Sequence, residues 1–598
     1  MSRGKLGLVL TLLMAALVGG FWLADWLTLW LLGVSAPLAW NTWWQYVRVV
    51  DLPQYAPYAG KIKSAGAVGF GLPLLAWLLL VLPLLRRRRA SLHGDASFAT
   101  FADLRKAGLL KQTPESILMG SHKGRYLWLG GSRHVIAISP TRSGKTTSIA
   151  IPVLLTYQHS MVVLDVKGEL FKATSGWRQA QGHAIRVWAP YDAAGQTHRF
   201  NPMTALAGME PGKRIGEIQT MAATLYPDEP GKDPFWTSQA RAAFTAFASF
   251  LIEAWDADVL PLVRAGAPRM ALPDPDTSPK FPSFERILRL SSGADGVGIK
   301  ATLEAILTDS RYAYVSPQTR TVFRNLGGLA KQTFSSVLAT MQAPLQQFLN
   351  PTLAAATNGT DFDLASLRKR PTTLYVIVPA NKLDESGKLL NIFFSSVIGA
   401  NLDRQLGDTP DLKYQLLMLM DEFTAMGRLE AWARRISVSA GYGVRDLCIV
   451  QSRAQLRSAY GDDDAQNFIT NHGVQVVFAP REQADANEYS EMLGYRTLHR
   501  KHRSTSRGRG ANQVSINFTE EKRALLLPQE IKELPQDDEL IFHEGYRPIR
   551  ARKNWFFKDR SLRQRAAIAP ARIRIAAPAT QPEPAEAVAI PVAAQPAE

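Results

Sequence analysis

The sequence predicts a mixed α/β protein with a largely parallel sheet, an all-helical insertion domain and a two-helix transmembrane anchor at its amino terminus. Three observations predict this fold class. Two long uncharged runs lie near the amino terminus, short apolar runs of strand length recur through the rest of the chain, and a region of helical periodicity separates two groups of them. At 598 residues, the chain is long enough for several folding units.

Composition narrows the class of protein. With 46% hydrophobic and 20% charged residues, the chain can bury a large core, which excludes wholesale disorder. A single cysteine, Cys448, excludes an intramolecular disulfide framework. The net charge of +17 favours contact with nucleic acid or with anionic lipid, and does not distinguish between them.

Two uncharged runs are long enough to cross a membrane. The run from Leu6 to Ala24 would span roughly 28 Å as a helix, and the run from Ser64 to Leu85 about 33 Å. We therefore predict an anchor over residues 1–90, with transmembrane helices at about 6–30 and 64–85 and a periplasmic loop at about 35–63. A cleaved signal peptide is the alternative for the first run, but no obvious cleavage site follows it.

The basic residues beside these runs predict their orientation. Arg86 to Arg89 follow the second run directly, and Arg3 and Lys5 precede the first. Because Lys and Arg are enriched on the cytoplasmic side of membrane helices, both ends of the anchor should face the cytoplasm. The bulk of this multi-pass chain is then cytoplasmic.

Apolar runs of strand length predict the sheet. They alternate with helical segments, which is typical of parallel strands joined by crossover helices. The runs are His134 to Ser139, Met161 to Leu164, Ala184 to Trp188, Thr373 to Val378, Leu416 to Met420, Leu447 to Val450 and Val474 to Phe478.

The pattern changes between the third and fourth of these runs. From Phe235 to Ala254, for example, apolar residues recur at three- and four-residue steps. We therefore predict that residues 91–200 and 353–560 form one sheet domain and that residues 201–352 form an all-helical insertion that splits it. Residues 561–598, rich in Pro and Ala, are predicted to be a disordered tail.

A phosphate-binding loop joins the first cytoplasmic strand to its helix, which we expect over Thr147 to Tyr157 with a kink near Pro152. The segment Ser139-Pro-Thr-Arg-Ser-Gly-Lys-Thr146 matches the phosphate-loop pattern except that Ser139 replaces its first glycine. Backbone N–H groups at such a turn point at one anion, and Lys145 would reach the β- and γ-phosphates. A simple strand-to-helix turn is the alternative. The predicted nucleotide-binding residues are Ser139, Thr141, Arg142, Ser143, Gly144, Lys145, Thr146 and Thr147.

A second motif supplies the acidic groups that phosphoryl transfer needs. The uncharged run Leu416 to Met420 ends in Asp421 and Glu422, which places both carboxylates at the carboxyl edge of the sheet, where ligands bind in open α/β folds. We predict that Thr146 and Asp421 hold Mg²⁺ and that Glu422 is the general base acting on water.

Other candidates follow the same reasoning. Gln451 ends a third strand and is predicted to sense the γ-phosphate, with a purely structural glutamine as the alternative. Arg445 is our candidate for an arginine finger that completes a neighbouring subunit's site, together with Arg434 and Arg435, although surface ion pairs are an alternative for each. Cys448 is expected to be buried and inert.

Two charged clusters have no unique interpretation. Asp165, Lys167 and Glu169 end the strand after the phosphate-loop helix, where they would form a site edge, a subunit contact or a solvated turn. A basic Ser- and Gly-rich segment is predicted to be a loop that contacts DNA or is merely solvated. Its basic residues are Arg500, Lys501, Arg503, Arg507 and Arg509.

From about Leu6 to Lys558, the ordered set of motifs resembles the TraG-type ATPases of conjugation, which are type IV secretion coupling proteins. Two membrane runs precede the SPTRSGKT loop, the DVKGE turn, the MDEF strand end and the IVQS strand. Phe200-Asn-Pro202 before the insertion, Phe235-Trp236 within it and Leu526 to Glu530 near the end extend the similarity. Val166 departs from the usual Pro.

The resemblance implies a RecA-like P-loop ATPase of the bacterial inner membrane that binds ATP and Mg²⁺. It also implies a homohexamer with nucleotide sites between subunits. The implied partners are single-stranded DNA, relaxase or relaxosome proteins, and inner-membrane components of the type IV secretion channel. Alternatives are a nucleotide-stabilised docking receptor for a protein-secreting system and a membrane-tethered pump for double-stranded DNA.

Overall fold

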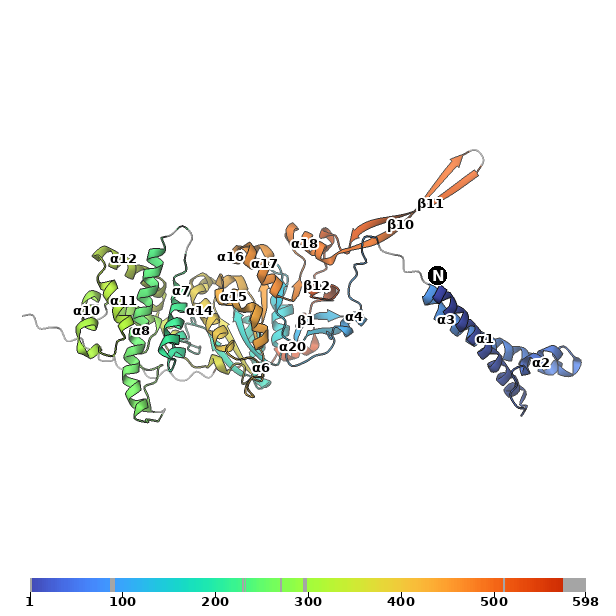
Figure 1. The fold of residues 1–598 in the computed structure, drawn as a ribbon, viewed down its shortest axis with the longest axis horizontal. Coiled ribbons are helices and arrows are strands. Elements are labelled where there is room, and N and C mark those ends of the chain that lie inside the picture. The colour runs from blue at the N-terminus through green and yellow to red at the C-terminus, as the bar shows by residue number, and fades with distance from the viewer. Residues whose placement is uncertain are drawn as a thin grey trace, which may run out of the picture. The chain divides into compact units, whose positions relative to one another are not determined.

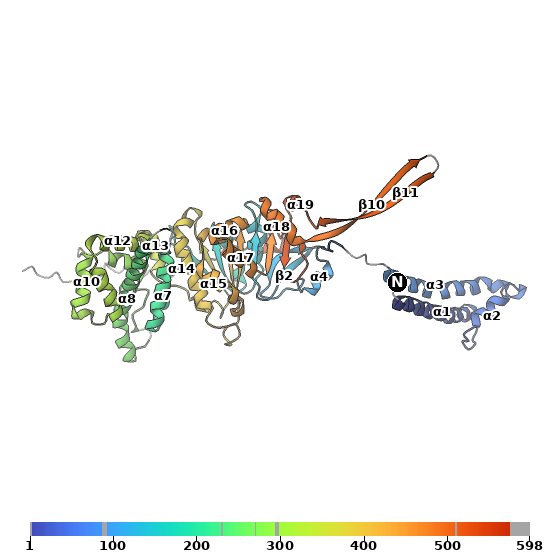
Figure 2. The ribbon, with the colours of Figure 1, turned by 45° about the horizontal axis from the view of Figure 1, so that its top comes forward.

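A computed structural model describes residues 3–85, 92–228, 231, 233–268, 271–293, 298–508 and 511–573, with backbone alone at 3–6, 83–85 and 501–518. The chain divides into two compact units, Met1–His93 and Gly94–Glu598. Figure 1 and Figure 2 show both units from two directions.

The first unit consists of two long apolar helices and a short connection. Helices α1 (Arg3–Leu32) and α3 (Ala59–Leu85) pack side by side, and α2 (Thr42–Val49) and a 3₁₀ turn (Pro53–Tyr58) lie between them in the chain. A Cβ at Gly69 would lie 2.6 Å from the Cα of Ala24, so this glycine allows the two helices to approach closely.

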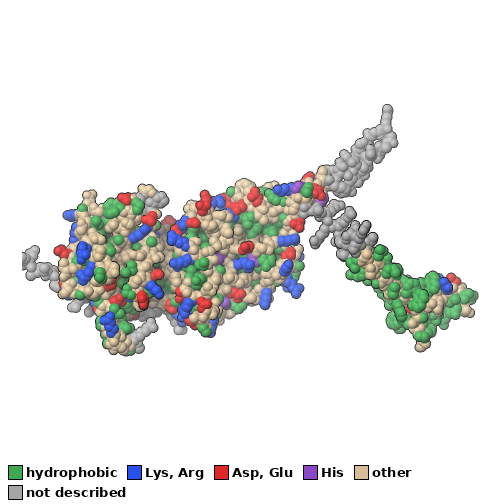
Figure 3. All heavy atoms as spheres, viewed as in Figure 1, with side chains coloured by type: hydrophobic (Ala, Val, Ile, Leu, Met, Phe, Trp, Pro, Cys, Tyr) green, Lys and Arg blue, Asp and Glu red, His purple; other side chains and the backbone are tan. Residues whose placement is uncertain are grey.

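Both long helices could cross a membrane, by their length and composition. The apolar stretches cover Gly7–Leu32 and Pro53–Leu82 and overlap the two predicted spans, but the second begins within the segment predicted to be a loop at about 35–63. Their exposed side chains are mainly hydrophobic, whereas acidic and basic side chains are interspersed over the second unit (Figure 3). The basic run Arg86 to Arg89, which predicts the orientation, lies outside the described residues.

The second unit is built on an 11-stranded sheet in the order β2-β1-β13-β12-β9-β3-β8-β7-β4-β6-β5. The seven strands from β9 to β5 in this order are parallel, which confirms the predicted class of sheet. They are β3 (Val135–Ile138), β4 (Ser160–Asp165), β5 (Ala184–Trp188), β6 (Thr372–Ile377), β7 (Leu416–Met420), β8 (Val444–Val450) and β9 (Val474–Val477). An antiparallel extension consists of β1 (Ile117–His122), β2 (Arg125–Leu129), β12 (Asp538–His543) and β13 (Ile549–Arg552).

Helices cover both faces of this sheet, so the parallel strands are apolar on both sides. One face packs against α4 (Phe101–Lys106), α5 (Ile151–Leu154), α6 (Glu169–Ala180) and α20 (Arg560–Ala566). The other packs against α14 (Leu383–Asn401), α15 (Glu430–Ser439), α16 (Arg453–Tyr460), α17 (Asp462–Asn471), α18 (Gln483–Leu493) and α19 (Pro528–Lys532). The helix predicted after the phosphate loop begins as a π-helical turn, Thr146–Ala150, before α5.

Between β5 and β6, the described residues of the 201–352 region contain helices and no strand, as predicted. The α-helices are α7 (Pro211–Leu225), α8 (Pro234–Arg264), α9 (Phe284–Ser291), α10 (Ile299–Thr308), α11 (Pro317–Gly327), α12 (Lys331–Gln342) and α13 (Pro351–Thr357). Their buried side chains join one core with those of the sheet. Helix α7 packs against α14, and beside them Trp188 of β5 stacks on Phe393 of α14 with ring centroids 4.7 Å apart, while Phe200 packs on the same ring.

Two predictions of irregular structure are wrong. The basic segment expected to be a loop belongs to a long antiparallel hairpin, β10 (Tyr495–Gly508) with β11 (Ala511–Ala524), which projects from the body of the second unit (Figure 1). Arg509 lies outside the described residues. Residues 561–566, expected to begin a disordered tail, belong instead to α20 (Arg560–Ala566), and beyond the helix Ala571 N donates to Ser175 Oγ at 3.0 Å. Residues 574–598 lie outside the described residues.

Candidate nucleotide site

The phosphate loop leaves the middle of the sheet. Strand β3 lies between β9 and β8, and Ser139 N donates to the Val450 carbonyl of β8 at 2.9 Å as the loop begins. Two residues of the loop have positive φ, Arg142 at 61° and Gly144 at 89°. These left-handed conformations fold the backbone back on itself before the first helical turn.

The predicted acidic pair meets the phosphate loop. Strand β8 separates β3 from β7, and Asp421 and Glu422 directly follow β7. Lys145 Nζ lies 2.5 Å from Glu422 Oε1 and 3.2 Å from the Asp421 carbonyl oxygen, and Thr146 Oγ1 donates to Asp421 Oδ2 at 2.9 Å. The structure therefore brings the four central residues of the prediction into direct contact.

Asp421 has the environment of a metal ligand. Its side chain is buried, and burial raises its pKa to about 6 against the opposing effect of the Lys145 charge. Its Oδ1 has no hydrogen-bond partner among the described groups. A buried carboxylate oxygen without a partner, next to a threonine hydroxyl, is the oxygen donor set that Mg²⁺ prefers. Thr146 and Asp421 therefore fit the predicted magnesium site.

Gln451 lies at the end of β8, beside this group. Its Nε2 donates to Glu422 Oε2 at 3.3 Å, so the two oxygens of Glu422 contact Lys145 and Gln451 respectively. The predicted base, phosphate-binding lysine and phosphate sensor thus form one chain of hydrogen bonds.

Arg445 does not belong to this site, and its assignment as an arginine finger is corrected. It lies at the amino end of β8, whereas the nucleotide motifs occupy the carboxyl ends. Its side chain is fully buried, and its guanidinium donates to the carbonyls of Arg133 at 2.9 Å and Glu115 at 2.8 Å. A finger must be exposed to reach a neighbouring subunit. Arg434 and Arg435, both on α15, are exposed.

Asp165 lies at the same sheet edge but stabilises a turn. Its carboxylate accepts from Phe171 N at 2.8 Å and Lys167 N at 3.3 Å, which closes the turn between β4 and α6. It is close enough that its charge contributes to the raised pKa of Asp421. Lys167 and Glu169 are exposed, with 3.9 Å between their charged groups.

Cys448, a residue of β8, is buried in a polar cluster. Burial raises the pKa of its thiol well above the usual value, which agrees with the predicted inert role. Its Sγ contacts Asp446 Oδ2 at 3.0 Å, and the same carboxylate is bonded by Trp432 Nε1 at 2.7 Å and faces His134 and His472 at 2.7 and 3.2 Å. The cluster ties β8 to the residues that precede β3 and β9.

A segment near the carboxyl end of the chain braces the phosphate loop, and the sequence analysis does not identify it. Lys553 Nζ donates to the Ser143 carbonyl at 3.2 Å, and Phe556 N donates to the Thr147 carbonyl at 3.1 Å. The Trp555 ring lies so close to Gly144 that a Cβ there would be 2.2 Å from it. The aromatic run Trp555-Phe-Phe557 is the only local signal, and it does not indicate a contact with the loop.

The sequence is similar to those of known bacterial proteins. The chain is 29% identical to Protein VirD4 of Agrobacterium fabrum over 481 residues, covering 79% of this chain and 67% of that protein. It is 27% identical to the conjugal transfer protein TraG of Escherichia coli over 570 residues, covering 86% and 85%.

Solved structures show the same fold. The bacterial conjugative coupling protein TrwBdeltaN70, in complex with sulphate, superposes with a TM-score of 0.52 at 17% identity, covering 80% of this chain and 99% of that one. Plasmid coupling protein TrwB in complex with ADP and Mg²⁺ superposes with a TM-score of 0.51 at 15% identity, covering 77% and 96%.

Residues 97–574 match the model of the family described as type IV secretory system conjugative DNA transfer. This match covers most of the chain and includes every residue of the nucleotide site described above. The chain therefore belongs to the type IV secretory system conjugative DNA transfer family, as a type IV coupling protein.

Proposed function

We propose that this chain is a membrane-anchored ATPase that uses ATP hydrolysis to deliver relaxase-bound single-stranded DNA, or protein substrates, to a type IV secretion channel. The observation that carries the proposal is the contact of Lys145 and Thr146 with Glu422 and Asp421 in a member of this family. TrwB, which has the same fold, has been solved with ADP and Mg²⁺ and with an ATP analogue.

Each residue of the site has a role in this reaction. Residues Ser139 to Thr147 would bind the phosphates through backbone N–H groups, and Lys145 would contact the β- and γ-phosphates. Mg²⁺, held by Thr146 and Asp421, would neutralise phosphate charge. Glu422 would accept the proton of the attacking water, and Gln451 would orient that water or the γ-phosphate. Binding of phosphate would draw Lys145 away from Glu422 and release the carboxylate for this role.

The family resemblance supports the following proposal for the assembly. Helices α1 and α3 would anchor the chain in the bacterial inner membrane as a multi-pass protein with its bulk in the cytoplasm. Six copies would form a ring with nucleotide between subunits, and the exposed Arg434 or Arg435 would supply the arginine finger. The expected partners are single-stranded DNA, the relaxase and inner-membrane channel components.

Two variants of the full-length protein test the proposal. Lys145→Ala should abolish ATP binding and turnover, and Glu422→Gln should bind ATP but lower turnover by about 10²-fold or more, because it removes the general base. Phosphate release, nucleotide binding and conjugative transfer are the measurements. Lys369→Ala is the matched control, because Lys369 also pairs with an acid, Asp411 at 2.9 Å, but lies before the amino end of β6.

The outcomes separate the alternatives. Undiminished ATP turnover in Lys145→Ala would overturn the ATPase assignment. A Glu422→Gln protein that binds ATP without hydrolysing it and still supports transfer would favour a docking receptor. Loss of transfer in both variants, with the control unaffected, is the result we expect.

A further inference from the structure

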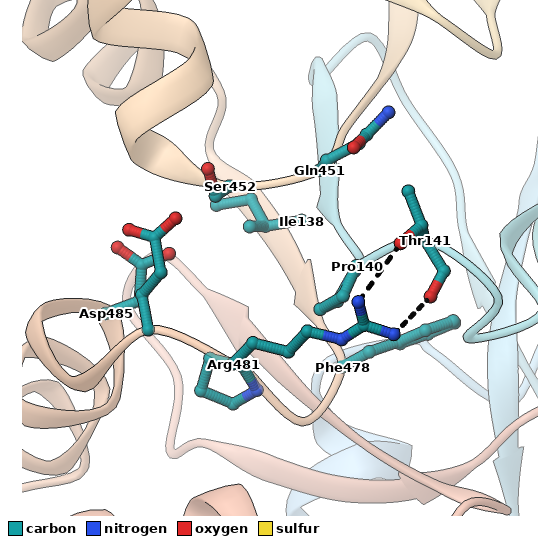
Figure 4. A pocket seen from close by; sticks show the side chains of 10 residues that line it. Ile138, Pro140, Thr141, Gln451, Ser452, Phe478, Arg481 and Asp485 are labelled. Atoms are coloured by element: carbon teal, nitrogen blue, oxygen red, sulfur yellow. Dashed lines mark hydrogen bonds between the residues drawn. The ribbon is translucent and has the colours of Figure 1, made fainter.

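A pocket opens beside the phosphate loop, on the side away from β7. The turn after β9 forms one wall, and Pro140 and Thr141 of the loop form another (Figure 4). The two segments leave the sheet together, because Val477 of β9 pairs with Ile138 of β3 and Phe478 N donates to the Ile138 carbonyl at 3.0 Å.

Arg481 reaches across this pocket to the loop. Its guanidinium donates to Thr141 Oγ1 at 3.2 Å and to the Thr141 carbonyl at 3.0 Å, the two bonds drawn in Figure 4. Both acceptors are neutral. Within the described part of the chain, Arg481 forms no ion pair with an acidic side chain, whereas the neighbouring Arg453 pairs with Glu488 at 2.6 Å.

No acidic side chain among the described residues is paired with Arg481, although Glu482 and Asp485 also line the pocket. The Lys145 charge is already matched by Glu422 at 2.5 Å. The Arg481 side chain is exposed, and a guanidinium has five N–H donors arranged to bind phosphate oxygens in pairs. Arg481 is exposed and contacts the phosphate loop only through neutral oxygen atoms. An anionic ligand would form stronger hydrogen bonds with its guanidinium and could replace these contacts.

The position of the pocket indicates which phosphate would be contacted. Gln451 also lines it, and the Gln451 amide bonds to Glu422, the proposed base. Because the base must lie beside the phosphate that water attacks, the pocket opens at the terminal-phosphate end of the loop.

We propose that Arg481 binds the terminal phosphate of ATP held by its own chain, exchanging Thr141 for phosphate oxygens, and stabilises the charge that develops there during transfer. This inference rests on the proposed function. It makes Arg481 a contact in cis, supplied by the subunit that holds the nucleotide, and distinct from the finger proposed to come from Arg434 or Arg435 of a neighbouring subunit.

The test compares two nucleotides that differ in the terminal phosphate. Full-length wild type, Arg481→Ala and Arg481→Gln are titrated with Mg²⁺ and either ADP or a non-hydrolysable ATP analogue. Both variants should lose about tenfold or more in affinity for the analogue, because a charge-assisted hydrogen bond is lost, and should keep their affinity for ADP. Arg481→Lys should retain part of the preference. Arg404→Ala, in the connection between α14 and β7, is the control.

Two results would overturn the inference. Equal losses for both nucleotides would indicate that Arg481 only braces Thr141, and unchanged affinities would show that it contacts neither. Arg481→Lys keeps the charge but loses the paired hydrogen bonds to Thr141, and Arg481→Gln keeps a polar side chain but loses the charge. Comparing the two separates the charge from the brace even if Arg481→Ala is unstable. Because these titrations need no hydrolysis, they decide the role of Arg481 even if the wild type proves not to be an ATPase.

Discussion

At the scale of single residues, the groups proposed to bind nucleotide contact one another directly. Lys145 and Thr146 contact Asp421 and Glu422, so a bound phosphate would replace one set of polar contacts by another. This arrangement has a free-energy cost, because the carboxylate of Asp421 is buried and burial disfavours its ionised form.

We expect magnesium-dependent nucleotide binding to weaken as the pH falls below about 6. Burial raises the pKa of Asp421 to about 6. Ionisation of this buried carboxylate therefore lowers the stability of the fold as the pH rises from the ordinary pKa of Asp through 6. Bound Mg²⁺ offsets that penalty, and it does so only when the carboxylate is ionised. Affinity for ADP with Mg²⁺, measured from pH 5 to pH 8, should fall about tenfold per pH unit on the acid side.

The control for this profile is Asp421→Asn. The phosphates of ADP titrate in the same range and contribute equally to both proteins, so the difference between the two profiles reports Asp421. Identical pH profiles would contradict a role for this carboxylate in holding the metal.

The sequence predicts the central site residues because they are local signals. The phosphate loop is one continuous segment, and Asp421 and Glu422 end an apolar run. Arg481, Lys553 and Trp555 approach the loop only through the order of the strands, and no spacing in the chain predicts that order. The error at Arg445 has the opposite origin, since an arginine that precedes an apolar run lies at the amino edge of a parallel sheet.

At the scale of elements, the buried strands and the long helices are predictable, and the polar elements are not. The parallel strands are continuous apolar runs because both faces of the sheet are covered. Strand β10 of the hairpin has Arg, Ser and Thr along its length and no alternating apolar face. In β11, Val514, Ile516 and Phe518 do alternate with polar residues, a strand signal that the sequence analysis does not identify. Helix α20 is short and rich in Arg and Ala, so its sequence looks like the start of a disordered tail.

Docking of α20 should contribute measurably to stability. Leu562 is fully buried, and Arg565 Nη1 donates to the Leu155 carbonyl at 2.8 Å. Leu562→Ala should lower the free energy of unfolding by about 2–5 kcal/mol, because it leaves a cavity beneath the helix. Chemical denaturation of the full-length protein measures this loss.

Arg563→Ala is the matched substitution in the same helix, where the side chain is exposed. It should change the stability by less than about 0.5 kcal/mol. Similar stabilities for the two variants would contradict the docked position of α20.

At the scale of the whole molecule, the excess of basic residues should govern contact with DNA. With 69 Lys and Arg against 52 Asp and Glu, binding of single-stranded DNA should release counterions from the phosphate backbone. The logarithm of the association constant should fall linearly with the logarithm of salt concentration, by about 0.7 per phosphate contacted. Fluorescence anisotropy of a labelled oligonucleotide at increasing salt measures the slope, and a slope near zero would contradict backbone recognition.

The first residues of the second unit are bonded to the base of the hairpin. Gly94 O accepts from Thr497 N at 3.0 Å, Ala96 N donates to Tyr495 O at 3.1 Å, and Ala99 N donates to the Pro548 carbonyl at 2.8 Å. A pulling force transmitted along the chain through residue 93 would therefore act first on the hairpin and on the antiparallel strands of the sheet, before it acted on β3 or β7. We therefore expect tension on the segment before residue 94 to act first on these backbone bonds, away from the residues proposed to bind nucleotide.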